Sequence, residues 1–224
     1  MGSKWRGEGP DITEQHGWNV LDDHLLYTCG LVHDLGAGRI GGRAPIPTRA
    51  RLHQGELSLA VGPAARSTWR ALGNGSYVNS STVAFGSASF VIGSMVGSAV
   101  GNAARRNRAI ADAQPRWIPD GPGELTVTDR RAVFGQQQNP LDLGWTGLDS
   151  VELIAPEIVQ CSFQDTYGNG YMTVQLHTLW ASLVFVLAAR AAFPAHPRLL
   201  QGDWLPPGFE ARCAAMGRQC PPVR

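Results

Sequence analysis

The sequence contains very little lysine and little charge of either sign. Lys4 is the only lysine among 224 residues, so every other fixed positive charge belongs to an arginine. Charged residues make up 17% of the chain, and the formal net charge at pH 7 is +1. A nearly neutral chain has no overall attraction for nucleic-acid phosphates. We therefore expect no nucleic-acid partner.

The sequence also lacks the short motifs that mark common catalytic and metal sites. It has no G-x-S-x-G nucleophile motif, no P-loop, no G-x-G-x-x-G after a strand and no HExxH zinc motif. We therefore predict a protein that is not an enzyme and that needs no cofactor and no metal.

Cysteine is scarce and widely spaced, and neither C-x-x-C pairs nor a dense disulfide framework is present. The four cysteines are Cys29, Cys161, Cys213 and Cys220. Residues 1–15 are polar, with Asp11 and Glu14 where a signal peptide would need an apolar core. This pattern predicts free thiols in a reducing cytoplasm, with a Cys213–Cys220 bridge as the alternative for that pair.

Hydrophobic periodicity predicts a helix over Val20–His33 that ends at Gly36. Further along the chain the period changes to two, which indicates β-strands. The expected strands are Gly55–Val61, Glu124–Asp129, Arg131–Gly135, Leu141–Trp145, Ser150–Ile154, Ile158–Asp165 and Tyr171–His177. Thr178 is the expected N-cap of a helix over Leu179–Ala192, and a short helix is expected over Phe209–Met216. The inward phase of these elements places Trp145, Phe163, Val174, Leu176 and Leu183 in one buried cluster.

Two phrases of the sequence resemble bacterial PH-like and GRAM-like domains. They are GELTVTDRRAVF, from Gly123 to Phe134, and LGWTGLDSVEL, from Leu143 to Leu153. The resemblance implies an α+β fold with a PH-like antiparallel β barrel or sandwich, closed by a C-terminal helix. It also implies a binding module whose ligand is a phosphoinositide, a peptide or another protein.

The chain departs from that family by a long segment between the first strand and the rest. We expect an N-terminal arm and short helix over residues 1–48, a PH-like domain over 49–193 with a helical insertion at 82–113, and a Pro-rich tail over 194–224. Residues Val83–Ala104 of the insertion carry no charge. Their length of about 20 residues is close to the minimum for a membrane span.

Glycines recur every four residues in this insertion, at Gly93, Gly97 and Gly101. Such spacing lines one face of a helix with small residues and lets a second helix approach closely. We expect this face to be covered by protein, either its own domain or a second copy of the chain. The alternative function is therefore an oligomer-forming or membrane-inserting protein that acts through this helix.

Arginines offer a candidate site for lipid phosphates. The set consists of Arg105, Arg106, Arg108, Arg130 and Arg131. Guanidinium groups bind phosphate oxygens in a bidentate manner, and clusters of them favour anionic lipid surfaces. A solvated surface is the plainer interpretation of short charge runs.

A third set of residues suggests a metal-dependent hydrolase. His24, His33 and Asp34 are potential ligands, and Cys29 lies between the histidines. Their spacing matches no known metal motif, and an amphipathic helix with Cys29 in the core explains it equally well. We therefore favour a non-enzymatic, cytoplasmic or membrane-peripheral adaptor whose partner is a protein or an anionic lipid.

Overall fold

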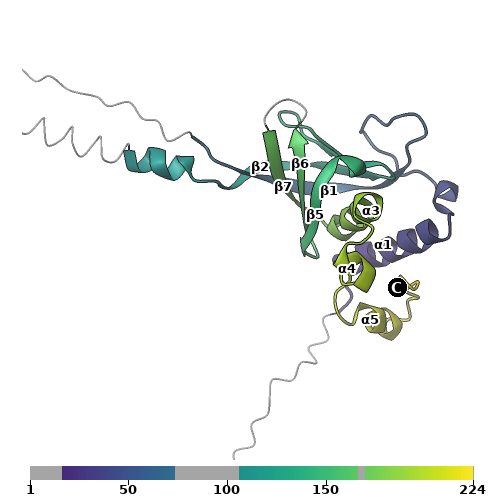
Figure 1. Cartoon of the computed structure of the whole chain (residues 1–224). Helices are drawn as coiled ribbons and strands as arrows, with labels where there is room; N and C mark the ends of the chain where they lie inside the picture. The colour runs from purple at the N-terminus through teal and green to yellow at the C-terminus, as the bar shows by residue number, and fades with distance from the viewer. Residues whose placement is uncertain (1–16, 74–105, 166–169, 224) are drawn as a thin grey trace, which may run out of the picture.

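A computed structural model describes residues 17–73, 106–165 and 170–223. Figure 1 shows a sheet with helices gathered on one side and a long strand pair that extends away from them. The strands are β1 (Ser58–Arg70), β2 (Arg116–Thr128), β3 (Arg131–Gly135), β4 (Leu141–Gly144), β5 (Leu148–Ala155), β6 (Ile158–Asp165) and β7 (Gly170–His177). The helices are α1 (Val20–Gly36), α3 (Ala181–Ala192), α4 (Pro197–Gln201) and α5 (Phe209–Ala215), and residues 106–113 are also helical.

The seven strands form one antiparallel sheet in the order β4-β3-β2-β1-β7-β6-β5. This confirms the α+β class and the antiparallel strands of the predicted barrel or sandwich, but the sheet itself is not closed, because β4 and β5 lie at opposite ends of the order. The short turn Trp145–Gly147 joins these two edge strands, and α3 packs against the turn and against β5 and β6. β4 and β5 are not joined by a ladder of backbone hydrogen bonds, and α3 covers the place where the sheet stays open between them.

The first two strands are longer than the sequence pattern predicted. β1 begins at Ser58 and runs to Arg70, and β2 begins at Arg116, eight residues before the predicted start at Glu124. Pro119 and Pro122 both lie in β2, close to an irregularity where the register shifts and Gly121 has φ +106°. Bulges of this kind are where a sheet tolerates proline and glycine.

The part of β1 before Ala65 lacks a strand partner on the β7 side, because β7 pairs only with Ala65–Thr68. Side chains from the helical layer satisfy the free carbonyl groups instead. The Tyr27 hydroxyl donates to Leu59 O at 2.7 Å, Trp180 Nε1 donates to Val61 O at 3.2 Å, and Thr178 Oγ1 donates to Pro63 O at 3.0 Å. Buried carbonyl groups need such partners, so these three bonds allow the sheet to open without leaving polar groups unpaired.

Thr178 is therefore not the N-cap that the sequence predicted. α3 begins after Trp180, which makes no side-chain capping bond, while the Thr178 hydroxyl bonds to β1 and accepts from Trp180 N at 3.3 Å. The helix starts two residues later than predicted because the threonine is used to join it to the sheet.

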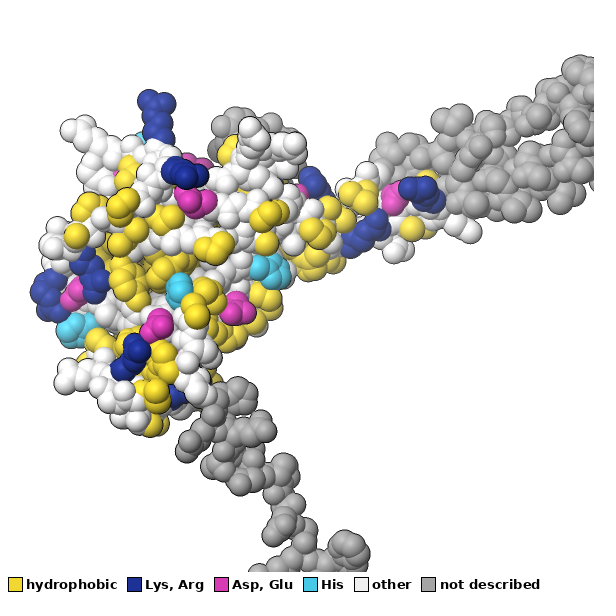
Figure 2. Space-filling view, turned by 180° about the vertical axis from the view of Figure 1, so that it is seen from behind, with side chains coloured by type: hydrophobic (Ala, Val, Ile, Leu, Met, Phe, Trp, Pro, Cys, Tyr) yellow, Lys and Arg dark blue, Asp and Glu magenta, His cyan; other side chains and the backbone are white. Residues whose placement is uncertain are grey.

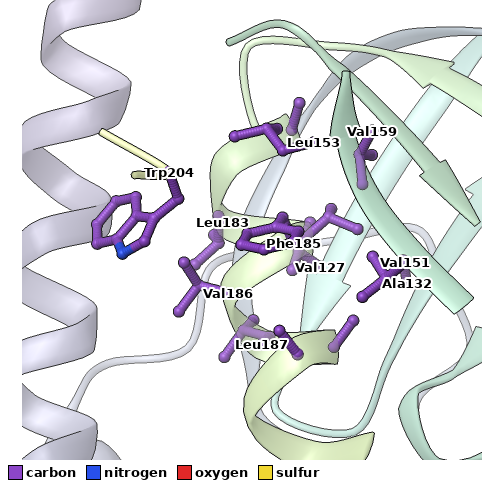
Figure 3. Close-up of a cluster of buried hydrophobic side chains, with 14 of the residues drawn as sticks. Val127, Ala132, Val151, Leu153, Val159, Leu183, Phe185, Val186, Leu187 and Trp204 are labelled. Atoms are coloured by element: carbon purple, nitrogen blue, oxygen red, sulfur yellow. The ribbon is translucent and has the colours of Figure 1, made fainter. Parts of the chain in front are cut away.

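α3 is apolar on all sides, and its residues from Ala181 to Ala189 are buried. A helix of this kind must be covered on both faces. Figure 3 shows the side chains of α3 enclosed from two sides. The strands that carry Val127, Val151 and Val159 lie on one side, and Trp204 and α1 lie on the other. The predicted core residues Trp145, Val174, Leu176 and Leu183 are buried as expected, and Phe163 is half-buried against the same core.

The N-terminal helix and the C-terminal segment belong to this same core. Leu25 and Leu31 of α1 are buried, as are Trp204 and Phe209 near the C-terminus. α1 begins at a capping box in which the Asn19 side chain accepts from Asp22 N and the Asp22 side chain accepts from Asn19 N. Helices at both ends of the chain thus cover the outer face of α3.

Gly123 opens the first phrase of the PH-like resemblance, and its role is steric. A Cβ atom at this position would lie 2.6 Å from Phe134 Cζ and 2.7 Å from Gly135 O on the neighbouring strand. We expect Gly123→Ala to lower the free energy of unfolding by about 1–3 kcal/mol, because the backbone of β3 cannot easily move away. Chemical denaturation can measure this, with Gly144→Ala as the control, since a Cβ there meets nothing within 4 Å. Equal effects of the two substitutions would refute the steric explanation.

Candidate functional site

The Thr-Asp-Arg-Arg phrase forms the turn between β2 and β3 and holds in place the loop that precedes β1. Thr128 Oγ1 accepts from Arg130 N and Arg131 N, and Asp129 Oδ1 accepts from Leu57 N at 2.9 Å. Arg130 Nη2 donates to Gly55 O at 3.3 Å. The part of the sequence that most resembles a family signature therefore has a local structural role.

A buried ion pair forms the centre of this turn. Arg131 donates to both carboxylate oxygens of Glu56, at 2.8 and 2.9 Å, and it also contacts Asp142 and Arg51 O. The Glu56 side chain is fully buried. Burial alone would raise its pKa, but hydrogen bonds from Arg131, His53 N and Thr128 outweigh that effect and lower the pKa to about 2. Arg131 is thus committed to protein carboxylates.

The structure separates the five predicted lipid-binding arginines. Arg130 is exposed near the Ser58/Thr128 end of the β1–β2 pair. Arg106 and Arg108 belong to the helical residues that precede β2, at the Arg70/Arg116 end. With about 3.3 Å per residue, the two ends are roughly 40 Å apart. Arg105 lies outside the described residues. One lipid headgroup therefore cannot contact both groups.

The far end of the β1–β2 pair carries exposed apolar and cationic side chains together. We call it the ribbon tip and define it by Trp69, Arg70, Leu72, Arg106, Arg108, Ile110, Arg116 and Trp117. Trp69 and Trp117 are opposite each other across the strands, with ring centroids 5.4 Å apart. Trp69, Leu72 and Ile110 are each about half exposed. Figure 2 shows apolar and arginine side chains at the ribbon tip, where the chain extends from the main body of the molecule.

Positive charge dominates the ribbon tip. Residues 71–111 contain no acidic residue, and the next one, Asp112, contacts Arg116 at 3.3 Å and Arg108 at 3.9 Å. The Arg108 side chain is 87% exposed, and its contact with Asp112 is the longer of the two. The tip thus presents guanidinium groups beside tryptophan rings.

Side-chain hydrogen bonds join β1 to β2 where this strand pair, the ribbon, extends beyond the rest of the sheet. The Asp120 side chain on β2 is fully buried and accepts from three β1 side chains: Arg66 Nε at 2.9 Å, Thr68 Oγ1, and Arg70 Nη2 at 3.0 Å. Arg66 also donates to Asn139 O. This network stiffens the base of the ribbon and fixes the direction in which the tip points.

Gly93, Gly97 and Gly101, together with residues 82–105 of the predicted insertion, lie outside the described residues. Among the described residues, no helix has the length and apolar character needed to cross a membrane.

The histidines of the metal hypothesis lie apart. His24 packs on Trp180 with ring centroids 4.2 Å apart, while His33 is nine residues further along α1, roughly 13 Å away. Asp34 is bound by Arg43 and Arg39, whose hydrogen bonds hold the pKa of its carboxyl below its usual range. Within the described residues, no three metal-ligating side chains are grouped closely enough to hold an ion.

Sequence reasoning missed Trp69, Arg70, Arg116 and Trp117 as a group. A signal was present: a Trp-Arg and an Arg-Trp dipeptide border the uncharged segment at similar distances on both sides. Only the antiparallel register places the two dipeptides opposite each other. No protein-family model matches the sequence, and a search of curated proteins finds no significant match.

Proposed function

We propose that this protein is a non-enzymatic binding module of PH-like type that attaches peripherally to anionic membranes from the cytoplasm. The architecture supports the fold part of this proposal, because a seven-stranded antiparallel sheet is followed directly by one buried helix. Two helical segments then cover the helix from outside. The carrying observation is the ribbon tip, which lies at the end of the ribbon far from α1, α3, α4 and α5 (Figure 1).

The chemistry of the tip matches the interface of a bilayer. Tryptophan rings concentrate at the level of lipid headgroups, where an apolar ring and a polar N–H are both accommodated. Each arginine near an anionic surface adds about 1 kcal/mol of attraction, and its guanidinium group binds phosphate in a bidentate manner. Trp69 and Trp117 lie beside Arg70 and Arg116 in the ribbon, so both kinds of contact can form at once.

We expect the protein to sediment with vesicles of phosphatidylcholine and phosphatidylserine at low salt and to be released progressively as salt increases. Charge reversal of Arg106 and Arg108 to glutamate should remove most of the binding. Arg130→Glu is the matched control, because Arg130 is exposed at the opposite end of the ribbon. If the control loses as much binding as the tip variant, the tip is not the contact site.

Trp69→Ala distinguishes electrostatic attraction from insertion of the tip. We expect this variant to bind more weakly at every salt concentration and to retain the salt dependence of the wild type. Wild-type protein that binds no anionic vesicle at all would refute the membrane proposal and leave a protein as the partner.

A further inference from the structure

The sheet has a second face, which is turned away from α3 (Figure 1). Thr68 on β1 and Val174 on β7 are buried, while the residues on either side of each are half-buried or exposed, because side chains alternate along a strand. The register places Gln175 of β7 beside Gln160 of β6 on the outer side. We call this outer surface the neutral face and define it by Trp69, Gln160, Ser162, Tyr171, Thr173 and Gln175.

The charged side chains of the ribbon lie on the opposite side of β1 and β2. Arg66 and Arg70 both bind Asp120 there, and none of the residues that define the neutral face is charged. Glu152 of β5 borders the neutral face beside Gln160, and it contacts His196 at 3.4 Å. A charged ligand would lose hydration on the neutral face without gaining an opposite charge. We therefore expect its ligand to be uncharged.

Two cross-strand pairs supply neutral hydrogen-bonding groups on this face. Gln175 Nε2 donates to Gln160 Oε1 at 3.1 Å, and the hydroxyl groups of Ser162 and Thr173 are bonded at 3.0 Å. The amide nitrogen of Gln160 and the amide oxygen of Gln175 take no part in the first bond, so a donor and an acceptor lie side by side. A ligand hydroxyl group both donates and accepts, and it matches this pair. Because the pairing already orders the side chains, less conformational entropy is lost when a ligand binds.

Aromatic rings border these polar pairs. The register joins Thr68 of β1 to Val174 of β7, and its continuation by one residue places Trp69 beside Thr173. Tyr171 precedes Thr173 by two residues and lies on the same side of β7. Trp69 is 46% exposed and Tyr171 is 62% exposed, so a ligand can reach both rings. The negatively charged faces of such rings attract the C–H groups of a ligand.

We infer that the neutral face is a binding site for a neutral saccharide chain. The C–H groups of the sugar rings stack on Trp69 and Tyr171, and the sugar hydroxyl groups bond to Gln160 and Gln175. A purely apolar ligand would cover the two amides and leave them without partners, which costs free energy. A saccharide carries both apolar C–H faces and neutral hydroxyl groups, so it satisfies the rings and the amides together.

Titration of the full-length protein with neutral hexasaccharides tests this inference. The probes are cellohexaose, maltohexaose and the β-1,4-linked hexamer of mannose, and binding is followed by tryptophan fluorescence and by isothermal titration calorimetry. We expect at least one probe to bind saturably and with the same affinity at low and high salt, because a neutral ligand is not held by screened charges. The absence of saturable binding with all three probes would overturn the inference.

Variants of the neutral face locate the site. The double variant Gln160→Ala, Gln175→Ala should bind the saccharide about tenfold more weakly, because the hydrogen bonds of two amides are lost. Tyr171→Ala should also bind more weakly, and its position is exposed, so it should fold normally. Circular dichroism checks the fold of each variant. If both variants bind as tightly as the wild type, the neutral face is not the site.

The charge reversal of Arg106 and Arg108 separates this inference from the membrane proposal. That variant should lose vesicle binding and keep the saccharide affinity of the wild type, because both arginines lie outside the neutral face. The double glutamine variant should show the reverse pattern. Saccharide binding that is lost when Arg106 and Arg108 are reversed would place the site at the ribbon tip and overturn the inference.

Discussion

Phe185→Ala is expected to lower the free energy of unfolding by about 3–5 kcal/mol, close to the limit that a marginally stable domain can tolerate. Phe185 is fully buried in α3, and its ring makes an edge contact with His196, centroid to centroid at 5.0 Å. Helices and strands enclose α3 on all sides, so the surroundings cannot easily collapse into the space that the ring leaves. Urea unfolding followed by far-ultraviolet circular dichroism can measure the change.

Arg190→Ala provides the control, because Arg190 is exposed in the last turn of the same helix. We expect its effect to be within about 0.5 kcal/mol of zero. A Phe185→Ala variant as stable as this control would mean that α3 is not enclosed by the core. Leu183→Ala offers a second check, with an expected loss of about 2–5 kcal/mol.

Glu56→Gln is expected to lower the free energy of unfolding by about 3–5 kcal/mol at neutral pH, since it removes one partner of a buried ion pair. Arg131 would keep Asp142, but its two bonds to the fully buried carboxylate would be lost or weakened. Asp149→Asn is a suitable control, because Asp149 is exposed on β5. A similar loss in both variants would show that Glu56 has no special role.

The same ion pair predicts how stability depends on pH. Glu56 has a folded-state pKa of about 2, against an ordinary value of 4.5. A depressed carboxyl pKa contributes stability that is complete above the unfolded value and is lost as the pH falls through the folded value. Wild-type stability should therefore fall between about pH 4.5 and pH 2, and Glu56→Gln should lose less stability over that range. Parallel pH profiles for the two proteins would contradict the low pKa.

Much of the fold could be predicted from the sequence, because the local hydrophobic patterns agree with the tertiary contacts. β6 has the predicted bounds Ile158–Asp165, and its alternation of Val159 and Cys161 with polar neighbours matches a strand with one buried face. β3 also has its predicted bounds. α1 begins at the predicted residue and ends at Gly36, as expected.

Prediction failed where a residue's role depends on a distant partner. Thr178 has the sequence character of a helix cap, but its hydroxyl bonds to Pro63 O, 115 residues earlier in the chain. Arg131 was assigned to a lipid phosphate, and the fold places it against Glu56, 75 residues away. Charge runs and capping residues look alike in sequence whether they face solvent or another segment, because their partners are set by chain topology.

The sequence by itself determined the α+β class, the antiparallel strands and the apolar helix after them, because these depend on periodicities of two and 3.6 residues. Only the tertiary structure decided that the sheet stays open, that side-chain donors cap Leu59, Val61 and Pro63, and that Trp69 meets Trp117. The physical reason is that hydrogen bonds and cross-strand pairs act over a few ångströms, and only the folded chain brings residues so far apart in sequence within that distance.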